Sequence, residues 1–321
     1  MQISVIIPTR NRASLLSRTL NSIVGQTLKQ TEFETLVIDN GSKDDTKKTV
    51  DSFINKIANL KYFYEETPGL HVGRHRGLKE AQSDILVYAD DDIEAFPTWL
   101  EALKESFKDD KVVLVGGKIL PKWEGEVPDW ITKMWEKKNN LGQCLGYLSI
   151  LDFGDNNIEI PAGFVFGCNF SIRKNILIEA GGFHPDGMPQ ELIKFRGDGE
   201  SYVSKFIEEK KLKTIYNPDA SVYHIITKER LTIEYFCKRA YNQGISDSYT
   251  YLRNNKSSLK TKRENTKIIL KNIIKRLYLF IKKDKESLKI FKNYLNGFEF
   301  HKREFKRDIN LKEWVYKKNY L

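Results

Sequence analysis

Three consecutive aspartates, Asp90, Asp91 and Asp92, directly follow the apolar run Ile85–Ala89. The run is short and partly β-branched and aromatic, so we predict a buried strand. Adjacent carboxylates repel one another unless a cation neutralises them, and ligands bind at the carboxyl ends of strands in α/β sheets. The triplet therefore indicates a divalent metal that holds a phosphorylated substrate. The alternative is that Asp91 and Asp92 only cap a helix that begins near Pro97.

Two further strands are predicted ahead of the triplet. The first, Ile3–Ile7, leads into the polar segment 8–12, and the second, Glu34–Ile38, leads into the polar turn 39–42. Between them, apolar residues recur at helical spacing. Parallel βαβ connections are right-handed and bring such strand ends to one rim of the sheet. We therefore expect a nucleotide-binding crevice at that rim.

In these segments and further along, the chain resembles the inverting nucleotide-sugar glycosyltransferases of family 2, which have the GT-A fold. The motifs that carry the resemblance occur in the family's order over residues 1–230. They are Val5–Arg12, Val37–Thr46, Gly69–Gly77, Tyr88–Asp92, Gly163–Arg173, Gly181–Phe183, Gly197–Glu200 and Pro218–His224. The resemblance implies an α/β catalytic domain over residues 1–230, with a Rossmann-like, mostly parallel sheet flanked by helices.

The resemblance also implies which residues bind the donor nucleotide. Asp39 would accept a hydrogen bond from an N–H of the base, which suits uracil or thymine and hence UDP or dTDP donors. Pro8 and Thr9 would line the base pocket, with Arg10 and Arg12 nearer the phosphates. Taken alone, Asp39 also fits an ordinary turn, and the two arginines also fit a solvated helix start, where their charge opposes the helix dipole.

Two further positions are predicted to contact the substrates. Arg74 lies in segment 69–77, which has no acidic residue, and its guanidinium suits the ribose or the diphosphate. The family usually has asparagine at the next position, where this chain has His75 without an assigned role. The alternative for Arg74 is a basic surface loop before a helix. Asn169 is the candidate for a hydrogen bond to the donor sugar or the acceptor.

Within the triplet, the resemblance implies that Asp92 binds Mn²⁺ or Mg²⁺ bridging the diphosphate. Asp91 would lie on the ribose or sugar side, and Asp90 would support either neighbour. A bound cation of this kind stabilises the leaving nucleoside diphosphate as a Lewis acid. His224 corresponds to a family position that often reaches the metal. The alternative for a lone histidine on an apolar strand is a hydrogen-bonded place in the core.

Inverting transfer also needs a base that takes the proton from the acceptor hydroxyl. The candidates are Asp198 and Glu200, which Gly199 separates where many relatives have an adjacent pair. We predict Glu200 as the base and Asp198 as its orienting residue or as a ligand of the acceptor. The alternatives are a helix N-cap for Asp198 and a dipole-complementary position in the first turn for Glu200.

Charge is distributed unevenly along the chain. Residues 251–321 contain 21 Lys/Arg against 7 Asp/Glu, a net charge of +14, whereas the remainder has a net charge of −4. We predict a basic helical extension over residues 231–321, with helices at Thr232–Tyr251, Thr266–Lys283 and Lys285–Gly297. Because basic amphipathic helices suit anionic membrane surfaces, we predict such a surface as a partner of residues 256–321. The alternative is a helical hairpin packed on the catalytic domain.

Cysteine content and hydropathy favour an enzyme of the cell interior. The three cysteines are widely spaced, no apolar stretch reaches the length of a membrane span, and the first residues lead straight into a strand without a signal peptide. We expect a cytoplasmic location, including the inner face of the membrane.

The resemblance, together with these observations, implies a metal-dependent inverting glycosyltransferase. It would move a hexose from a nucleoside diphosphate donor, with UDP favoured, to a hydroxyl of a glycan or lipid-linked acceptor in polysaccharide or glycoconjugate synthesis. One alternative is a nucleotidyltransferase, but such enzymes carry a Gly-rich basic loop after the first strand, and here that loop has no glycine. A nucleic-acid-binding protein would explain the basic tail, yet no recognised module supports it, so we expect no nucleic-acid partner.

Overall fold

The computed structural model describes residues 2–255 and 284–321. Their main sheet has eight strands in the order β10-β12-β6-β11-β4-β1-β2-β3. β11 runs antiparallel to β4 and β6, and β10 runs antiparallel to β12, whereas the other neighbours are parallel. The strands are β1 Ile3–Thr9, β2 Phe33–Asp39, β3 Leu60–Tyr64, β4 Ile85–Ala89, β6 Val112–Gly116, β10 Ile158–Glu159, β11 Asn169–Arg173 and β12 Lys213–Tyr216.

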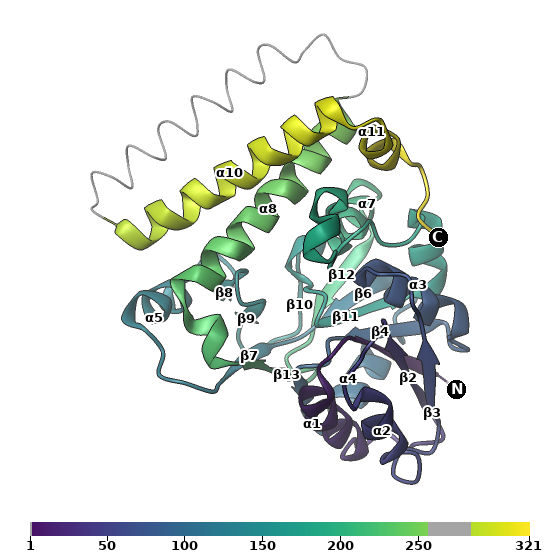
Figure 1. Cartoon of the computed structure of the whole chain (residues 1–321). Helices are drawn as coiled ribbons and strands as arrows, with labels where there is room; N and C mark the ends of the chain where they lie inside the picture. Colours follow the sequence, from purple (N-terminus) through teal and green to yellow (C-terminus); the bar gives the residue numbers. More distant parts are fainter. Residues whose placement is uncertain (1, 256–283) are drawn as a thin grey trace.

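The strand order changes direction at β1. The chain moves outward from β1 to β2 and β3, and then returns through α3 to β4 on the opposite side of β1. Because crossovers are right-handed, α1 and α2 lie on one face of these strands and α3 lies on the other (Figure 1). The carboxyl ends of β1 and β4 therefore form a topological switch point, the usual ligand-binding place in open α/β sheets. These helices are α1 Ala13–Val24, α2 Thr46–Asp51 and α3 Leu70–Glu80.

The strands at the centre of the main sheet are buried on both faces, which explains why their sequences are continuous apolar runs. All residues of β1 and β2 are buried, as expected for parallel strands covered on both faces. A glycine allows α3 to lie close to β1, since a Cβ atom at Gly77 would come within 2.2 Å of Ile6. Further helices cover the sheet at α4 Trp99–Ser106, α6 Lys174–Ala180 and α7 Glu200–Glu209.

A second sheet brings a histidine to the end of β4. Its strand order is β5-β13-β7-β9-β8. β13 pairs antiparallel with β5 so that His224 lies opposite Ile93, the residue after Asp92. The backbone N–H of Ile225 also donates to the carbonyl of Asp92 at 2.9 Å. The strands are β5 Ile93–Ala95, β7 Ile119–Trp123, β8 Gln143–Leu145, β9 Ile150–Asp152 and β13 Val222–Ile226, and α5 Asp129–Glu136 follows β7.

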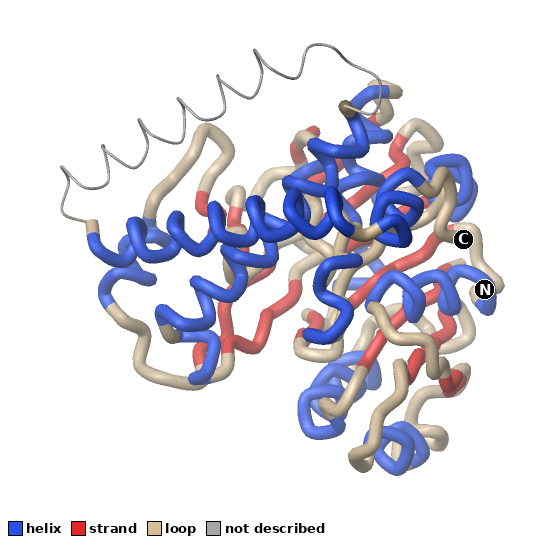
Figure 2. The backbone as a smooth tube through the Cα atoms, turned by 45° about the horizontal axis from the view of Figure 1, so that its top comes forward, coloured by secondary structure: helices blue, strands red, loops and turns tan. Residues whose placement is uncertain are grey.

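Two long helices, α8 Ile233–Asn254 and α10 Lys285–Arg307, lie side by side along the catalytic part (Figures 1 and 2). They are parallel, because Lys289 pairs with Glu234 and, further on, His301 contacts Ser248. A Cβ atom at Gly297 would lie 1.9 Å from the carbonyl oxygen of Tyr241, so the helices touch at their backbones there. α11, Ile309–Tyr316, follows α10.

The C-terminal helices differ from the sequence prediction in their bounds, and α11 was not predicted. α8 begins one residue after the predicted Thr232, but α10 continues well past the predicted end at Gly297. Gly297 lies inside α10, where it allows close contact with α8, and does not end the helix. The predicted end at Gly297 was wrong for this reason. The helix predicted over Thr266–Lys283 lies outside the described residues. Among residues 2–255 and 284–321, no helix combines the length and apolarity that crossing a bilayer requires.

Candidate active site

Asp90, Asp92 and His224 form a compact cluster at the carboxyl end of β4. One ligand atom from each lies within 4.8 Å of the others, and His224 Nε2 is 3.3 Å from Asp92 Oδ1. His224 Nδ1 lies 2.8 Å from the carbonyl oxygen of Leu148. It must donate there, so Nε2 carries the lone pair, as in most metal-binding histidines, and Arg230 lies 3.0 Å from this nitrogen.

The donor set of this cluster fits a divalent cation. Asp92 Oδ1 is buried and accepts no hydrogen bond from any residue that the structure describes. A buried oxygen without a hydrogen-bond donor is costly. Carboxylate oxygens suit Mn²⁺ or Mg²⁺, and the imidazole favours Mn²⁺ of the two. Asp92 and His224 would hold the metal, with Asp90 beside them. Both predicted metal ligands and the first aspartate of the triplet therefore lie together.

Two arginines neutralise the triplet. Arg12 contacts Asp91 Oδ1 at 2.5 Å and Asp92 Oδ2 at 2.7 Å, and Arg230 contacts Asp92 Oδ2 at 2.7 Å and His224 Nε2 at 3.0 Å. Burial would raise the pKa of Asp92, but its interactions with His224, Arg230 and Arg12 hold this pKa below its ordinary value. Arg230 belongs to the 3₁₀ turn Lys228–Leu231, which has no recognisable motif. Sequence reasoning therefore missed it.

Asp91 faces the end of β1. Thr9 donates its hydroxyl to Asp91 Oδ2 at 2.7 Å. Burial, opposed by Arg12 and reinforced by Asp92, raises the pKa of Asp91 to about 7. A cavity of about 210 Å³ opens beside these side chains. Its lining residues are Pro8, Thr9, Arg10, Arg12, Asn40, Leu70, Asp90, Asp91 and Gly187.

Asp39, the predicted base-binding residue, is buried at the end of β2, where it pairs in register with Thr9. Its carboxylate accepts from the Ser42 N–H at 2.8 Å and from the Tyr62 hydroxyl at 2.7 Å. A carboxylate has about four acceptor positions, so acceptor capacity remains. The next residue, Asn40, lines the cavity described above.

Arg74 lies between the Asp90–Asp92–His224 cluster and the predicted base. Its side chain is only 3% exposed and lies 3.1 Å from Glu200 Oε2 and 3.9 Å from Asp90 Oδ1. Arg74 therefore contacts two carboxylates, and its contact with the donor diphosphate stays a prediction. A Cβ atom at Gly167 would approach Arg74 to 2.3 Å and Glu200 to 3.0 Å. This glycine therefore leaves the space that the Arg74–Glu200 ion pair occupies.

Asp198 and Glu200 have different surroundings although one residue separates them. Asp198 accepts hydrogen bonds from His184 Nδ1 and from the Thr250 hydroxyl, both at 2.6 Å. The N-cap of α7 is Gly199, whose φ of 54° favours glycine, so Asp198 does not cap this helix. Both oxygens of Asp198 accept hydrogen bonds inside the protein, whereas one oxygen of Glu200 is bonded to Arg74 and Glu200 lines both cavities described below.

Asn169 lies in the core rather than in a cavity. It is fully buried at the start of β11. Its Oδ1 accepts from the indole N–H of Trp99 at 2.9 Å, and its Nδ2 donates to the carbonyl of Ala220 at 2.9 Å. Because both ends of the amide are bonded inside the protein, this geometry favours a packing role over a contact with the sugar. No local pattern in the sequence reveals these partners.

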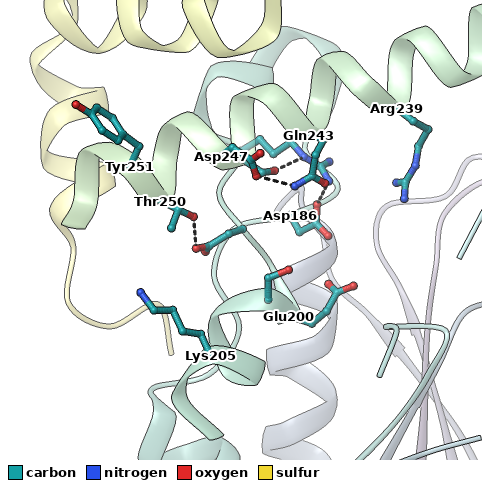
Figure 3. A pocket seen from close by; sticks show the side chains of 12 residues that line it. Asp186, Glu200, Lys205, Arg239, Gln243, Asp247, Thr250 and Tyr251 are labelled. Carbon is teal, nitrogen blue, oxygen red and sulfur yellow. Dashed lines mark hydrogen bonds and ion pairs between the residues drawn. The ribbon is translucent and has the colours of Figure 1, made fainter. Parts of the chain in front are cut away.

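Two cavities meet at Glu200. The larger, of about 470 Å³, lies between α7 and α8 (Figure 3), and a second has about 330 Å³. Both are lined by Glu200 and Ser201 of α7 and by Arg239 and Gln243 of α8. α8, which the sequence analysis assigned to the extension after residue 230, therefore supplies one wall of the space beside the predicted base. Nothing in the sequence indicated this role for α8.

The family model of glycosyl transferase family 2 matches residues 4–181, more than half of the chain. The chain belongs to this family and is a glycosyltransferase. The structure also resembles a mannosyltransferase from Pyrobaculum calidifontis, solved with GDP-Man and Mn²⁺. That likeness has a TM-score of 0.58 at 16% identity and covers 99% of this chain and 84% of the other. It identifies the fold as GT-A, as predicted.

Two further proteins are similar to this chain. One is a glucosyl-dolichyl phosphate glucuronosyltransferase of Haloferax volcanii, 23% identical over 77% of this chain and 76% of that protein. The other is the structure of TarS residues 1–349 from S. aureus in complex with UDP-GlcNAc, with a TM-score of 0.51, 18% identity, and coverage of 94% of this chain and 92% of that one. The chain spans less than half the length of several other curated relatives that it matches.

Proposed function

We propose that the protein is a metal-dependent inverting glycosyltransferase that moves a hexose from a UDP-sugar to a hydroxyl of a glycan or lipid-linked acceptor. One observation carries the proposal. Arg74 contacts Glu200 at 3.1 Å and Asp90 at 3.9 Å, so a carboxylate able to act as a base is held beside the Asp90–Asp92–His224 cluster. Single displacement requires this arrangement, since the donor pyrophosphate and the acceptor hydroxyl must flank one anomeric carbon.

The donor would lie across the carboxyl ends of β1, β2 and β4. Asp39, with acceptor positions to spare, would take an N–H of uracil, and Pro8, Thr9 and Arg10 would lie along the nucleotide. A divalent cation held by Asp92 and His224 would neutralise the diphosphate as it leaves. The exposed Arg10 lines the cavity beside Asp91, which supports a phosphate contact by this arginine.

Glu200 would act as the base. Its carboxylate lies at the start of α7 and lines both cavities beside that helix. It would take the proton from the acceptor hydroxyl while the acceptor oxygen forms its bond to the anomeric carbon and the bond to the nucleoside diphosphate breaks. Arg74 would hold the carboxylate in position. Asp198 would orient the loop before α7, because His184 and Thr250 occupy both of its oxygens.

The acceptor would enter through the cavities between α7 and α8. We therefore propose that residues 231–321 form a helical extension to the catalytic domain of residues 1–230 and help to bind the acceptor. A lipid-linked acceptor is supported by the Haloferax volcanii relative, which is a glucosyl-dolichyl phosphate glucuronosyltransferase. An anionic membrane surface as a partner of residues 256–321 belongs to the same proposal and rests on their positive charge.

A donor panel tests the proposed function. The protein is incubated with UDP-glucose, UDP-galactose, UDP-N-acetylglucosamine or GDP-mannose, with Mn²⁺ or with EDTA, and released nucleotide is measured. We expect metal-dependent release from at least one UDP-sugar, with Glu200→Gln retaining UDP binding but losing transfer. Release that is equally fast in EDTA, or no release from any donor, would contradict the proposal.

A further inference from the structure

The smaller of the two cavities beside Glu200 is lined by Arg239, whose guanidinium has no ion-pair partner among the residues that the structure describes. We call it the Arg239 cavity and define it by Tyr147, Phe166, Glu200, Ser204, Arg239 and Gln243. Glu200 and Arg239 are the charged residues among those that line it. The charge of Glu200 is already balanced by Arg74. Arg239 thus sets the charge that a ligand in this cavity would meet.

No carboxylate of the described residues lies within ion-pair distance of Arg239, although several acids are near. Asp186 pairs with Arg196 at 2.6 Å, and Asp198 is bonded to His184 and Thr250. Asp247 accepts from Gln243 and from the Tyr294 hydroxyl, both at 2.8 Å. The nearby acids are therefore engaged elsewhere, and Arg239 keeps its hydrogen-bond donors for a ligand.

The position of Arg239 is fixed by the fold. Figure 3 shows its side chain leaving α8 on the side of the helix that faces the loops near Glu200. α8 is held along its length by α10 and is tied to the loop before α7 by the Thr250–Asp198 hydrogen bond. The half-buried guanidinium therefore lies at a defined place beside the base. A substrate that fills the cavity would remove water from this cation, which is costly unless the substrate brings an anion.

We infer that Arg239 binds an oxyanion of a sugar substrate and makes the enzyme prefer an acidic sugar. The guanidinium fork matches a carboxylate or a phosphate, and the rings of Tyr147 and Phe166 give the cavity apolar walls against which a sugar ring can pack. The oxyanion has two possible sources, the carboxylate of a uronate on the donor or a phosphate ester on the acceptor. The inference rests on the proposed function, because it takes this cavity as the sugar site beside the base.

Two matched substrate pairs test the inference. The first pair, UDP-glucuronate and UDP-glucose, compares a donor whose sugar is charged with one whose sugar is neutral. The second pair, decyl-phosphoryl glucose and decyl glucoside, compares a charged acceptor with a neutral one. The measured quantity is the ratio of kcat/KM for the charged and neutral member of each pair. We expect the charged member to be preferred in one pair, and Arg239→Gln to lower that ratio by about 10- to 100-fold, the effect of losing a hydrogen bond between charged groups. Arg239→Lys should recover part of the ratio.

Lys238→Gln is the matched control, since this exposed neighbour on α8 lines neither cavity and its loss should leave the ratio unchanged. A ratio near one in both pairs for the wild type would overturn the inference. An equal loss on charged and neutral substrates in Arg239→Gln would also overturn it, as would weaker binding of UDP itself. Failure of the wild type to turn over any donor would instead refute the proposed function, and the inference with it.

Discussion

Nε2 of His224 lies 3.3 Å from Oδ1 of Asp92, although 131 residues separate Asp92, in the turn between β4 and β5, from His224 on β13. The antiparallel register of β13 with β5 produces this contact, because it places His224 opposite the residue that follows Asp92. Arg230 lies against the same two groups, at 2.7 Å from Asp92 and 3.0 Å from His224. A guanidinium thus neutralises the pair that we propose as metal ligands.

Replacing Arg230 should alter the metal-free protein more than the metal-bound one. Arg230→Gln takes a charged donor from a buried carboxylate, so without metal we expect the free energy of unfolding to fall by about 1–3 kcal/mol. Mn²⁺ should then stabilise the variant more than the wild type, because the cation no longer competes with the guanidinium. Denaturant unfolding with Mn²⁺ and with EDTA measures this. Equal stabilisation of both proteins by Mn²⁺ would show that Arg230 and the metal do not share a site.

The two acids before and within α7 should respond differently to substitution. Glu200→Gln should lower transfer by roughly 10²–10⁴-fold, the usual contribution of a positioned base, with UDP affinity nearly intact. Asp198→Ala should instead lower stability by about 1–3 kcal/mol, because His184 and Thr250 lose their acceptor. Turnover and thermal unfolding of both variants separate the roles. Near wild-type transfer by Glu200→Gln would move the base assignment to Asp198 or another group.

Gly167→Ala should damage catalysis through the Arg74–Glu200 ion pair. The added methyl group would lie 2.3 Å from Arg74 and 3.0 Å from Glu200, so the pair must separate or shift. Misplacing a catalytic group in this way is costly, and we expect transfer to fall at least about tenfold. Gly25→Ala is the control, since its Cβ atom would meet only Ser22 at 3.8 Å. Full activity of Gly167→Ala would show that the ion pair does not position the base.

Buried His301 should make the fold less stable in acid. Burial lowers the pKa of His301 from 6.5 to about 4, so the unfolded chain binds more protons between these pH values and stability falls as the pH drops through this window. Between pH 7 and pH 5, His301→Gln should therefore lose about 2 kcal/mol less stability than the wild type. Denaturant unfolding in EDTA at both pH values measures this. Identical losses in the two proteins would exclude His301 as a source of acid sensitivity.

The sequence alone predicted those site residues that come directly after a strand in the chain. Apolar runs located β1, β2 and β4, and the residues after them came together because parallel strands end at one rim. Arg230 and Arg239 were not predicted, since neither follows a strand and each gains its place through the packing of a turn or of α8. Asn169 looked available in the sequence, but Trp99 and Ala220 bond both ends of its amide. Such partners depend on tertiary contacts that no local pattern records.

The most direct test of the account is a crystal of the protein grown with UDP and Mn²⁺, with anomalous diffraction recorded for manganese. We predict one anomalous peak bonded to Asp92 and to Nε2 of His224, in contact with the diphosphate, and Arg230 moved away from both side chains. UDP bound at the ends of β1 and β4 without a manganese peak at that position would contradict the central claim.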